Sequence, residues 1–231
     1  MIEDKPDYSS AEYCSPKRMA SYGYQINEVM SQKPQTLLEI GIGNGVVTHI
    51  LRRAKIDVTT LDMEKQVKPD VIGSVLALPF KTNYFHGVLC CQVLEHLPLD
   101  KLAQALRELW RVTFAFAVVS LPDATRNYRI GVSIPKVRLT ITKDVQWKIR
   151  EQSFDGEHYW EIDKRGFLLP RILPHIREAG FTCLRHYRIW EWPYHRFFVL
   201  EKTFAPNQGA LCGNKTSKPG ILGSLPFIVG R

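Results

Sequence analysis

The sequence lacks any long hydrophobic run, and none of its apolar stretches approaches the roughly 20 residues that a membrane-spanning helix needs. Its first ten residues, MIEDKPDYSS, are acidic and polar, which is unlike a secretory signal. Cysteines are few and show no zinc-ligand spacing, so we expect no metal, and we interpret the adjacent Cys90 and Cys91 as reduced core residues. The cysteines of the chain are Cys14, Cys90, Cys91, Cys183 and Cys212. Together these absences favour a cytoplasmic protein without a membrane span.

Internal repeats are also absent, and the length of 231 residues suits one α/β domain with a sizeable core. The composition, 45% hydrophobic and 23% charged, is that of an ordinary globular protein. The net charge of +8 fits an anionic substrate, nucleic acid or a membrane surface. It fits a basic, solvated surface equally well, so charge alone selects no function.

The dinucleotide-binding fingerprint Gly-x-Gly-x-x-Gly is missing, because its third glycine would fall at Val46. The segment concerned reads TLLEIGIGNGVVTHIL over residues 36–51, a strand pattern that carries Glu39 and then breaks into glycines. These glycines are Gly41, Gly43 and Gly45. Glycines after a strand let the backbone turn tightly and approach a ligand, next to the free N–H groups of a helix start. The motif predicts a nucleotide-like cofactor and disfavours an NAD-dependent oxidoreductase; a plain strand-to-helix turn is the alternative.

Strand-like and helix-like segments alternate along the chain. A helix is expected over residues 15–31, and another near Arg165 that Pro170 and Pro174 should kink or shorten. Strands are expected in TLLEIG, KIDVTTLDM, DVIGSV, HGVLCCQV, FAFAVVSLP, TCLRHYRIW and RFFVLEKTF. Alternation of this kind predicts an α/β fold with a doubly wound sheet.

Two segments break the alternation. Residues 123–163 make a connection of about 40 residues, which is long and predicts an insertion or lid after the fifth strand. The insertion is basic, so it could grip phosphate, carboxylate or nucleic acid, or face solvent, and its segment KVRLTITK has the period of a hairpin strand. Residues 205–231 are rich in Gly, Pro and Ser and are expected to be a poorly ordered tail. Residues 1–204 would then be a single domain.

The end of the second expected strand carries Asp62, where a carboxylate can accept both hydroxyls of a ribose; a helix cap or loop acid is the alternative. With it, the segments LLEIGIGNG, LDM, VIGSVLALPFKTNYFHGVLCCQVLEHLP and FTCLRHYRIW…RFFVLEKTF resemble class I S-adenosylmethionine-dependent methyltransferases, in particular the type 11 group. The resemblance spans residues 36–204. It implies a Rossmann-like, mostly parallel seven-stranded sheet with an antiparallel last strand. It also implies methyl transfer (EC 2.1.1.-) that turns S-adenosylmethionine into S-adenosylhomocysteine, with no metal.

The same resemblance implies a cofactor site. Glu39 and the glycine loop would receive the methionine end, Asp62 the ribose, and Met63 the face of the adenine. The expected cofactor-binding residues are Glu39, Gly41, Ile42, Gly43, Gly45, Asp62, Met63, Ser74, Val75, Leu76, Cys91, Gln92 and Val93. Two positions depart from the family pattern, because many relatives carry an acid where Ser74 stands and Asp where His86 stands. A weaker adenine contact and altered local packing, respectively, are expected from these departures.

Methyl transfer needs positioning above all, and a base only if the acceptor must lose a proton. His158, in FDGEHYWEID, is the first candidate base, since an imidazole pKa of about 6.5 suits neutral pH, and His96 is the second. Tyr159 and Trp160 would wall the substrate pocket, and Arg18 would close it from the other side. The alternatives are that His158 and Trp160 anchor the insertion to the core, and that His96 packs at a turn.

The expected function is transfer of a methyl group to O, N or C of a small-molecule acceptor, such as a sugar or an anionic metabolite, by a monomer or homodimer. The net charge prompts RNA methylation as an alternative. Against it, the chain has no appended RNA-binding domain and no Asn-Pro-Pro-Tyr-type motif. A third possibility is a scaffold that binds the cofactor without catalysis. The departures from the family pattern at Ser74 and His86 are consistent with it.

Overall fold

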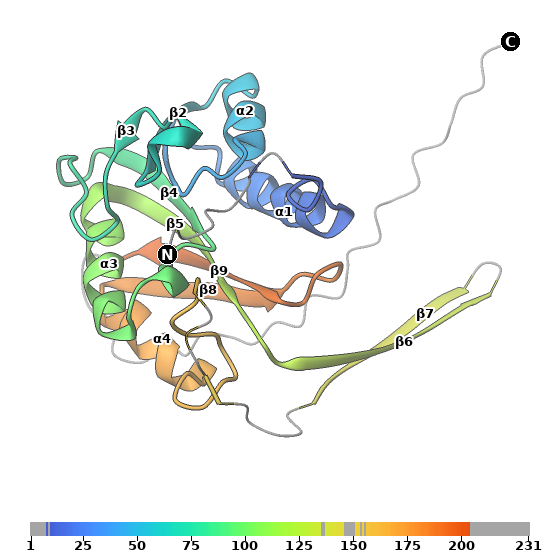
Figure 1. Ribbon diagram of the computed structural model, residues 1–231. Coiled ribbons are helices and arrows are strands. Elements are labelled where there is room, and N and C mark those ends of the chain that lie inside the picture. Colours follow the sequence, from blue (N-terminus) through green and yellow to red (C-terminus); the bar gives the residue numbers. More distant parts are fainter. Residues whose placement is uncertain are drawn as a thin grey trace, which may run out of the picture.

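The computed structural model describes residue 8 and residues 10–134, 137–145, 151–152, 154 and 156–203. Its main sheet has seven strands in the order β3-β2-β1-β4-β5-β9-β8 (Figure 1). The strands are β1 Thr36–Ile40, β2 Asp57–Asp62, β3 Val71–Ile72, β4 Phe85–Cys91, β5 Thr113–Pro122, β8 Phe181–Arg188 and β9 His195–Lys202. The strands β1 to β5 pair in parallel, and β9 is antiparallel to both of its neighbours. The expected Rossmann-like sheet with an antiparallel last strand is therefore confirmed.

Helices cover both faces of this sheet. They are α1 Pro16–Gln32, α2 Val46–Arg53, α3 Leu99–Val112 and α4 Leu169–Glu178, with short 3₁₀ turns η1 Lys65–Val67 and η2 Leu94–His96. The first helix begins as expected, with Pro16 in its first turn. The last begins later than expected and spans ten residues, with Pro174 inside it. Proline limits a helix in this way because it removes a backbone donor and clashes with the preceding turn.

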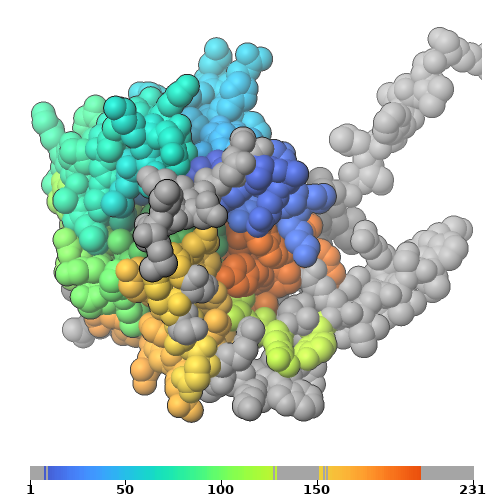
Figure 2. Space-filling view, in the orientation of Figure 1, coloured from blue at the N-terminus to red at the C-terminus, as the bar shows by residue number. Residues whose placement is uncertain are grey.

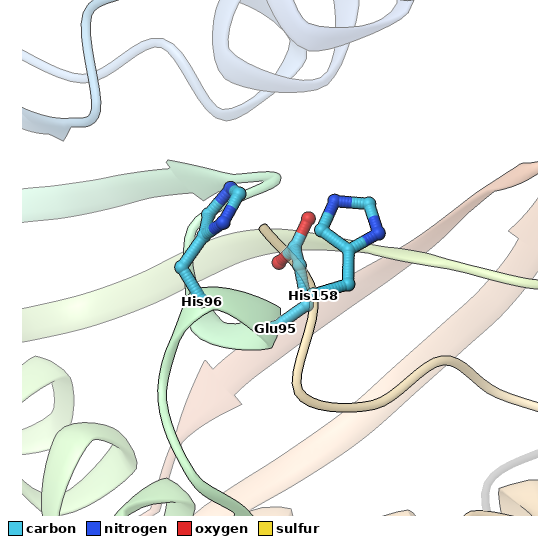
Figure 3. A group of neighbouring side chains, drawn as sticks. All are labelled: Glu95, His96 and His158. Carbon is cyan, nitrogen blue, oxygen red and sulfur yellow. The ribbon is translucent and has the colours of Figure 1, made fainter. Parts of the chain in front are cut away.

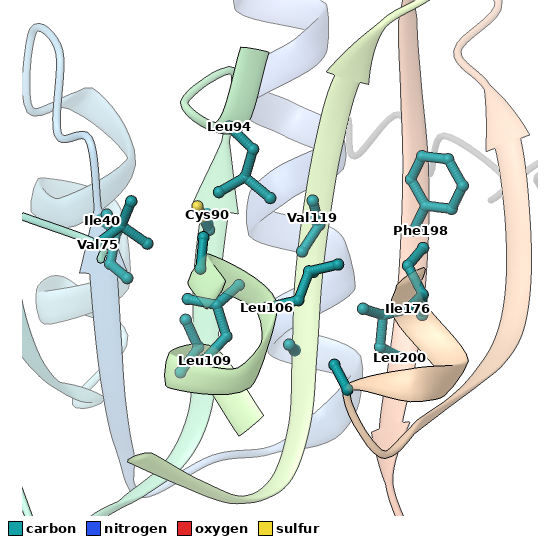
Figure 4. Packing of buried hydrophobic residues seen from close by; sticks show 14 of the residues in the cluster. Ile40, Val75, Cys90, Leu94, Leu106, Leu109, Val119, Ile176, Phe198 and Leu200 are labelled. Atoms are coloured by element: carbon teal, nitrogen blue, oxygen red, sulfur yellow. The ribbon is translucent and has the colours of Figure 1, made fainter. Parts of the chain in front are cut away.

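Two apolar clusters make the core, one on each face of the sheet. Alternate residues of β1 divide between them, since Leu38 and Ile40 belong to one cluster and Leu37 to the other. Figure 4 shows Leu106 and Leu109 of α3 and Ile176 of α4 packed over the strands. The middle of the run HGVLCCQV, residues 87–90, is buried between both layers, as its unbroken hydrophobicity predicts. This packing fixes the strand ends, and thereby the site that they carry.

Altered local packing was expected at His86, and the fold accommodates this side chain. Its ring stacks on Phe114 with centroids 5.0 Å apart, and its backbone N–H donates to the Thr36 hydroxyl at 2.9 Å. The expectation of reduced thiols at Cys90 and Cys91 is confirmed, and Cys14 is also a free thiol. Cys183 is disulfide-bonded, which its spacing along the chain did not indicate. Cys212 lies outside the described residues.

A separate antiparallel hairpin, β6 Arg126–Ile134 and β7 Val137–Val145, leaves the body after β5 (Figure 1). The extra hairpin expected from KVRLTITK is thereby confirmed. The expected tail over residues 205–231 lies outside the described part of the chain. Among the residues that are described, no helix is long and apolar enough to cross a bilayer.

Candidate active site at the carboxyl edge of the sheet

The carboxyl ends of three parallel strands meet at one edge of the sheet. Ile40 of β1 pairs with Leu61 of β2 on one side and with Cys90 of β4 on the other. The residues that follow in each strand, Gly41 and Asp62 among them, therefore lie side by side. Ligands of doubly wound sheets bind at this edge, so the register alone brings the expected cofactor residues together.

The glycine loop between β1 and α2 runs with left-handed backbone torsions, φ 78° at Gly41, 51° at Gly43 and 74° at Gly45. At Gly41 a side chain is also sterically excluded, because an added Cβ would lie 2.4 Å from Cγ2 of Val93. Gly45 has nothing within 4 Å of such a Cβ and caps the start of α2. The loop therefore combines a tight turn with a close approach to the end of β4.

Replacing Gly41 by alanine should destabilise the protein more than replacing Gly45 in the same way. Both changes incur the left-handed penalty of about 1–2 kcal/mol, but only the first adds the clash with Val93. We expect Gly41→Ala to lower the free energy of unfolding by about 1–3 kcal/mol more than Gly45→Ala, measured by chemical denaturation. Adding Val93→Ala should recover part of this difference; equal losses in the two single variants would contradict the contact.

Asp62 links the glycine loop to the end of β2. Its Oδ2 accepts a hydrogen bond from the backbone N–H of Ile42 at 3.0 Å, and its Oδ1 accepts one from Glu64 at 2.9 Å. Each carboxylate oxygen has a second lone pair, so the group can accept two further donors. Beside it, Met63 and Ile72 are 67% and 56% exposed. A carboxylate next to exposed apolar side chains suits a ligand that has both hydroxyl groups and a flat apolar ring.

Glu39 is only 3% exposed, near the end of β1. Its Oε2 accepts a hydrogen bond from the hydroxyl of Thr48 at 2.7 Å. Burial raises the pKa of Glu39 to about 7, although the Thr48 hydrogen bond and the charge of Arg52 oppose this. At neutral pH the protonated and ionised forms of Glu39 are therefore both populated, and a cationic ligand placed beside it would favour the ionised form.

The remaining expected cofactor residues form two further turns. The Ser74 hydroxyl accepts from the Leu76 N–H at 3.2 Å, and Val75 is buried. At the end of β4, Gln92 has φ 55° and binds Ser120 of β5 through its backbone at 3.0 Å and its side chain at 3.1 Å. Burial raises the pKa of Cys91 to about 12, so its thiol stays protonated at neutral pH. These groups shape the edge and supply no nucleophile.

A segment from the insertion, residues 156–163, returns to this edge. Ile162 donates to the carbonyl of Pro122 and accepts from Ala124, both at 2.9 Å, and Tyr159 N–H donates to the carbonyl of Glu95 at 2.9 Å. Residues 156, 157 and 159 of this segment are exposed, whereas residues 160–162 are buried; in the space-filling view the yellow part of the chain lies beside the green part (Figure 2). These backbone bonds place His158 beside the end of β4.

Trp160 was expected to form part of the wall of the substrate pocket, but the structure places it elsewhere. Its side chain is fully buried in the core, and its Nε1–H donates to the carbonyl of Leu97 at 2.9 Å. An indole of this size is better buried than exposed, so it anchors the segment, which was the alternative interpretation. Tyr159 remains 42% exposed and packs on Phe154 with ring centroids 4.6 Å apart.

The two candidate histidines meet with ring centroids 5.1 Å apart. His96 Nδ1 donates to the carbonyl of Glu157 at 2.9 Å, and His158 Nδ1 lies 3.4 Å from Oε1 of Glu161. The Glu95 carboxyl lies between the two rings (Figure 3), fully buried. Burial raises the pKa of Glu95 to about 8 and lowers that of His96. The edge thus holds two imidazoles and a carboxyl that is largely protonated at neutral pH.

Glu161 and Tyr194 support His158, and neither was expected as a site residue. Tyr194 donates its hydroxyl to Oε1 of Glu161 at 2.9 Å, and the same hydroxyl lies 3.4 Å from His158 Nδ1. Burial opposes ionisation of Glu161, but its hydrogen bonds to His158 and Tyr194 and the charge of Lys164 outweigh it and lower its pKa. The His-x-x-Glu spacing could have indicated Glu161; nothing in the sequence points to Tyr194.

The N-terminal residues cover the glycine loop from the other side. The ring of Tyr8 lies 3.7 Å from an added Cβ at Gly43 and packs edge-on against Tyr13 at 4.8 Å. The Arg18 guanidinium lies over two rings, 4.1 Å from the centroid of Tyr13 and 5.3 Å from that of Trp192. The expected role of Arg18 in closing the substrate pocket stays a prediction.

Comparison with known proteins agrees with this geometry. Residues 38–114 match a family model described as a methyltransferase domain. No curated protein matches the sequence. Solved structures with the same fold include the PH0226 protein from Pyrococcus horikoshii OT3, at 13% identity and a TM-score of 0.58 over 85% of this chain and 94% of that one.

Two further solved structures carry a bound product of the cofactor. The glycopeptide N-methyltransferase MtfA, complexed with S-adenosylhomocysteine, is 12% identical with a TM-score of 0.54 over 79% of this chain and 90% of that one. The 1,6-didemethyltoxoflavin-N1-methyltransferase of Burkholderia thailandensis, with 1,6-didemethyltoxoflavin and S-adenosylhomocysteine bound, is 15% identical with a TM-score of 0.52 over 87% of this chain and 93% of that one. At these identities the likeness establishes the fold, and the family match covers the part of it that holds the glycine loop, Asp62 and the end of β4.

Proposed function

We propose that this chain, a class I S-adenosylmethionine-dependent methyltransferase, transfers the methyl group of its cofactor to a small-molecule acceptor beside His96 and His158. The observation that carries the proposal is the meeting of two sets of groups at one edge of the sheet. The glycine loop and Asp62 form the cofactor side, and the two imidazoles form the acceptor side. Val93 connects them, since it packs on Gly41 and directly precedes η2, the turn that carries His96.

The residues present fit S-adenosylmethionine, which carries an ammonium, a carboxylate, a sulfonium, a ribose diol and an adenine. Glu39 would answer the positive charge, Asp62 the diol, and Met63 the adenine face. The other residues that would hold the cofactor are Gly41, Ile42, Gly43, Gly45, Ser74, Val75, Leu76, Cys91, Gln92 and Val93. When bound, the cofactor supplies an electrophilic methyl group. The protein's own contribution is to orient the acceptor and exclude water.

Proton loss by the acceptor is the step for which this chain offers chemical groups. A hydroxyl or amine acceptor must give up a proton, and imidazole is the side chain best suited to promote this near neutral pH. His158 is held by Glu161 and Tyr194, so its ring is fixed where it is needed. His96 is held by the carbonyl of Glu157. We therefore assign both histidines to the acceptor side.

Several features support a small, anionic acceptor. The Arg18 guanidinium lies against the rings of Tyr13 and Trp192 and is only partly exposed. Its one ion-pair partner among the described residues is the exposed carboxylate of Glu12, 3.8 Å away. Tyr159 offers an exposed ring on which a sugar or heterocycle can pack. The 1,6-didemethyltoxoflavin-N1-methyltransferase named above binds a small heterocycle in a related fold. A sugar or anionic metabolite methylated on O, N or C remains our proposal for the acceptor.

A methyl-acceptor screen with labelled S-adenosylmethionine tests the function. Acceptors should include anionic sugars, hydroxy acids, amines and an RNA pool, and cofactor binding should be measured beside it by calorimetry. We expect label transfer to at least one small-molecule class. Cofactor binding with no transfer to any acceptor would contradict the proposal and favour a scaffold. Transfer to RNA alone would favour the nucleic-acid alternative, which a steep loss of RNA affinity with salt would support.

The affinity for S-adenosylmethionine should rise with pH through the titration of Glu39. The pKa of Glu39 is about 7, and only its ionised form would pair with the positive charge of the cofactor. Apparent affinity is proportional to the fraction of protein in which Glu39 is ionised. Binding at pH 6 should therefore be about tenfold weaker than at pH 8. Calorimetry at both pH values checks this. Glu39→Gln should bind more weakly and lose the pH dependence; the same dependence in that variant would exclude Glu39 as its source.

A further inference from the structure

We propose that Glu95, His96 and His158 bind one divalent transition-metal ion, which receives an oxygen atom of the methyl acceptor. This inference rests on the proposed function and names the class of acceptor that the site would take, a molecule with a hydroxyl or carboxylate oxygen at the methylated position. Methyl transfer itself requires no metal. The ion would act on the acceptor alone, and it would revise the expectation from the sequence that no metal is present.

The first observation is an unpartnered carboxyl. Glu95 is 0% exposed, and among the described residues its carboxyl oxygens have no hydrogen-bond partner on another residue; only the backbone N–H of Glu95 itself acts on the carboxyl. A buried carboxyl without a partner is unfavourable unless a proton, a water molecule or a cation compensates it. Its backbone is fixed, because Glu95 lies in η2 and its carbonyl accepts a hydrogen bond from Tyr159. The carboxyl therefore stays in place and requires a proton, a water molecule or a cation beside it.

The second observation is the set of donors around that carboxyl. Glu95, His96 and His158 each offer one ligand atom, and these three atoms lie within 4.8 Å of one another. Figure 3 shows the carboxyl of Glu95 between the two rings. Ligand atoms about 2.0–2.2 Å from a tetrahedral metal ion lie about 3.3–3.6 Å apart. The three atoms would therefore have to approach one another by up to about 1.5 Å, through rotation of the two rings and the carboxyl group.

The third observation is how the rings are held. In metal sites a ligating histidine usually donates its other ring nitrogen to a backbone carbonyl or a carboxylate. Here Nδ1 of His96 faces the carbonyl of Glu157, and Nδ1 of His158 faces the carboxylate of Glu161. Coordination would then use Nε2 of both rings. The backbone of Gln92 also forms a hydrogen bond with the His96 ring, and the ion would replace that hydrogen bond.

A metal ion fits these groups better than direct contact with the substrate. Because Glu95 is fully buried, an acceptor molecule cannot touch its carboxyl unless the rings move apart, whereas a single ion would be small enough to lie between them. Two nitrogens and one carboxylate oxygen suit Zn²⁺, Fe²⁺, Co²⁺ or Mn²⁺, while Mg²⁺ and Ca²⁺ prefer oxygen ligands. Three protein ligands leave a position for a further oxygen.

The chemistry at that position balances without any oxidant or reductant. A hydroxyl bound to the ion has a lowered pKa, so its proton passes to water, and the two rings then act as metal ligands in place of the base role that they would have without an ion. The oxygen then attacks the methyl carbon, and the new C–O bond forms as the carbon–sulfur bond breaks. A carboxylate acceptor would need no deprotonation at all. The ion would thus both position the acceptor oxygen and activate a hydroxyl.

Metal titration of the full chain tests the proposal. Protein stripped with a chelator should be titrated calorimetrically with Zn²⁺ and with Mn²⁺, and separately with Co²⁺ while visible absorption is recorded. We expect one ion per chain and a Co²⁺ spectrum of a nitrogen- and oxygen-ligated site. Glu95→Gln and His158→Gln should each weaken binding at least about tenfold. His49→Gln, which changes an exposed histidine on α2, should bind as the wild type does.

Several outcomes would overturn the inference: no stoichiometric ion in the wild type, or unchanged affinity in both ligand variants. Circular dichroism and S-adenosylmethionine binding should first show that the variants fold. The two proposals also fail separately. Methyl transfer that survives chelation, without stoichiometric metal, overturns the metal site and leaves the proposed function standing. A tight ion in a protein that methylates nothing supports the site and contradicts the function.

Discussion

Replacing Asp62 by alanine should weaken S-adenosylmethionine binding at least about 100-fold. The carboxylate would accept two ribose hydroxyls, and hydrogen bonds to a charged group contribute about 1.5–3 kcal/mol each. At about 1.4 kcal/mol for each tenfold change in affinity, losing both gives a factor of about 100 or more. The change also leaves the N–H groups of Ile42 and Glu64 without their acceptor, which loosens the glycine loop. Calorimetry with the cofactor and with S-adenosylhomocysteine measures the effect.

Asp57→Ala is a matched control for this experiment. Asp57 is exposed and lies at the opposite end of the same strand, β2, so its loss should leave cofactor affinity unchanged. Asp62→Asn separates charge from shape, because the amide oxygen can still accept a hydrogen bond from the loop. We expect its affinity to fall between those of the wild type and Asp62→Ala. Cofactor affinity unaltered in Asp62→Ala would show that our map of the site is wrong.

The cofactor side of the site could be predicted from the sequence because its geometry follows from the sheet. In a parallel sheet, residues at corresponding strand ends are neighbours, so placing Glu39 and Asp62 near two strand ends already brings them together. The glycines that follow the first strand predict the tight turn, because glycine adopts left-handed backbone torsions readily. What the sequence could not show is the packing partner of Gly41, since Val93 belongs to another strand end, and only the folded register brings it within reach.

Element boundaries were less predictable where loop geometry competes with helical periodicity. The last helix was expected near Arg165 but begins at Leu169. The intervening residues form a turn in which Phe167 N–H bonds to the carbonyl of Lys164, and Gly166 has φ 90°. The hydrophobic period alone gave no sign of this turn, because glycine and the residues before Pro170 favour non-helical backbone for local steric reasons.

The acceptor side could be predicted only in part, because it is assembled from distant segments. The sequence indicated His96 and His158 separately, yet nothing in it shows that their rings meet at 5.1 Å. Tyr194 reaches Glu161 across 33 residues from the connection between β8 and β9. Trp160 was misplaced for a related reason: aromatic residues suit a pocket wall and a core equally well, and only burial decides between them.

His158→Gln should lower the turnover of an accepted substrate by about 10²- to 10⁴-fold, the usual range for losing a positioned proton-transfer group. The ring is held by Glu161 and Tyr194, whereas the groups that would hold the ribose and adenine are Asp62 and Met63. Cofactor affinity should therefore stay near that of the wild type. Single-turnover assays with labelled S-adenosylmethionine separate the chemical step from binding and product release.

His49→Gln provides the matched control, because it removes an exposed imidazole from α2, and its turnover should equal that of the wild type. Tyr194→Phe tests the support of His158, since it removes only the hydroxyl that Glu161 accepts, and its effect should be smaller. A purely structural role for His158 makes a different prediction. Turnover and cofactor affinity would then fall together with the free energy of unfolding, and Tyr194→Phe would lower stability without changing the rate of methyl transfer.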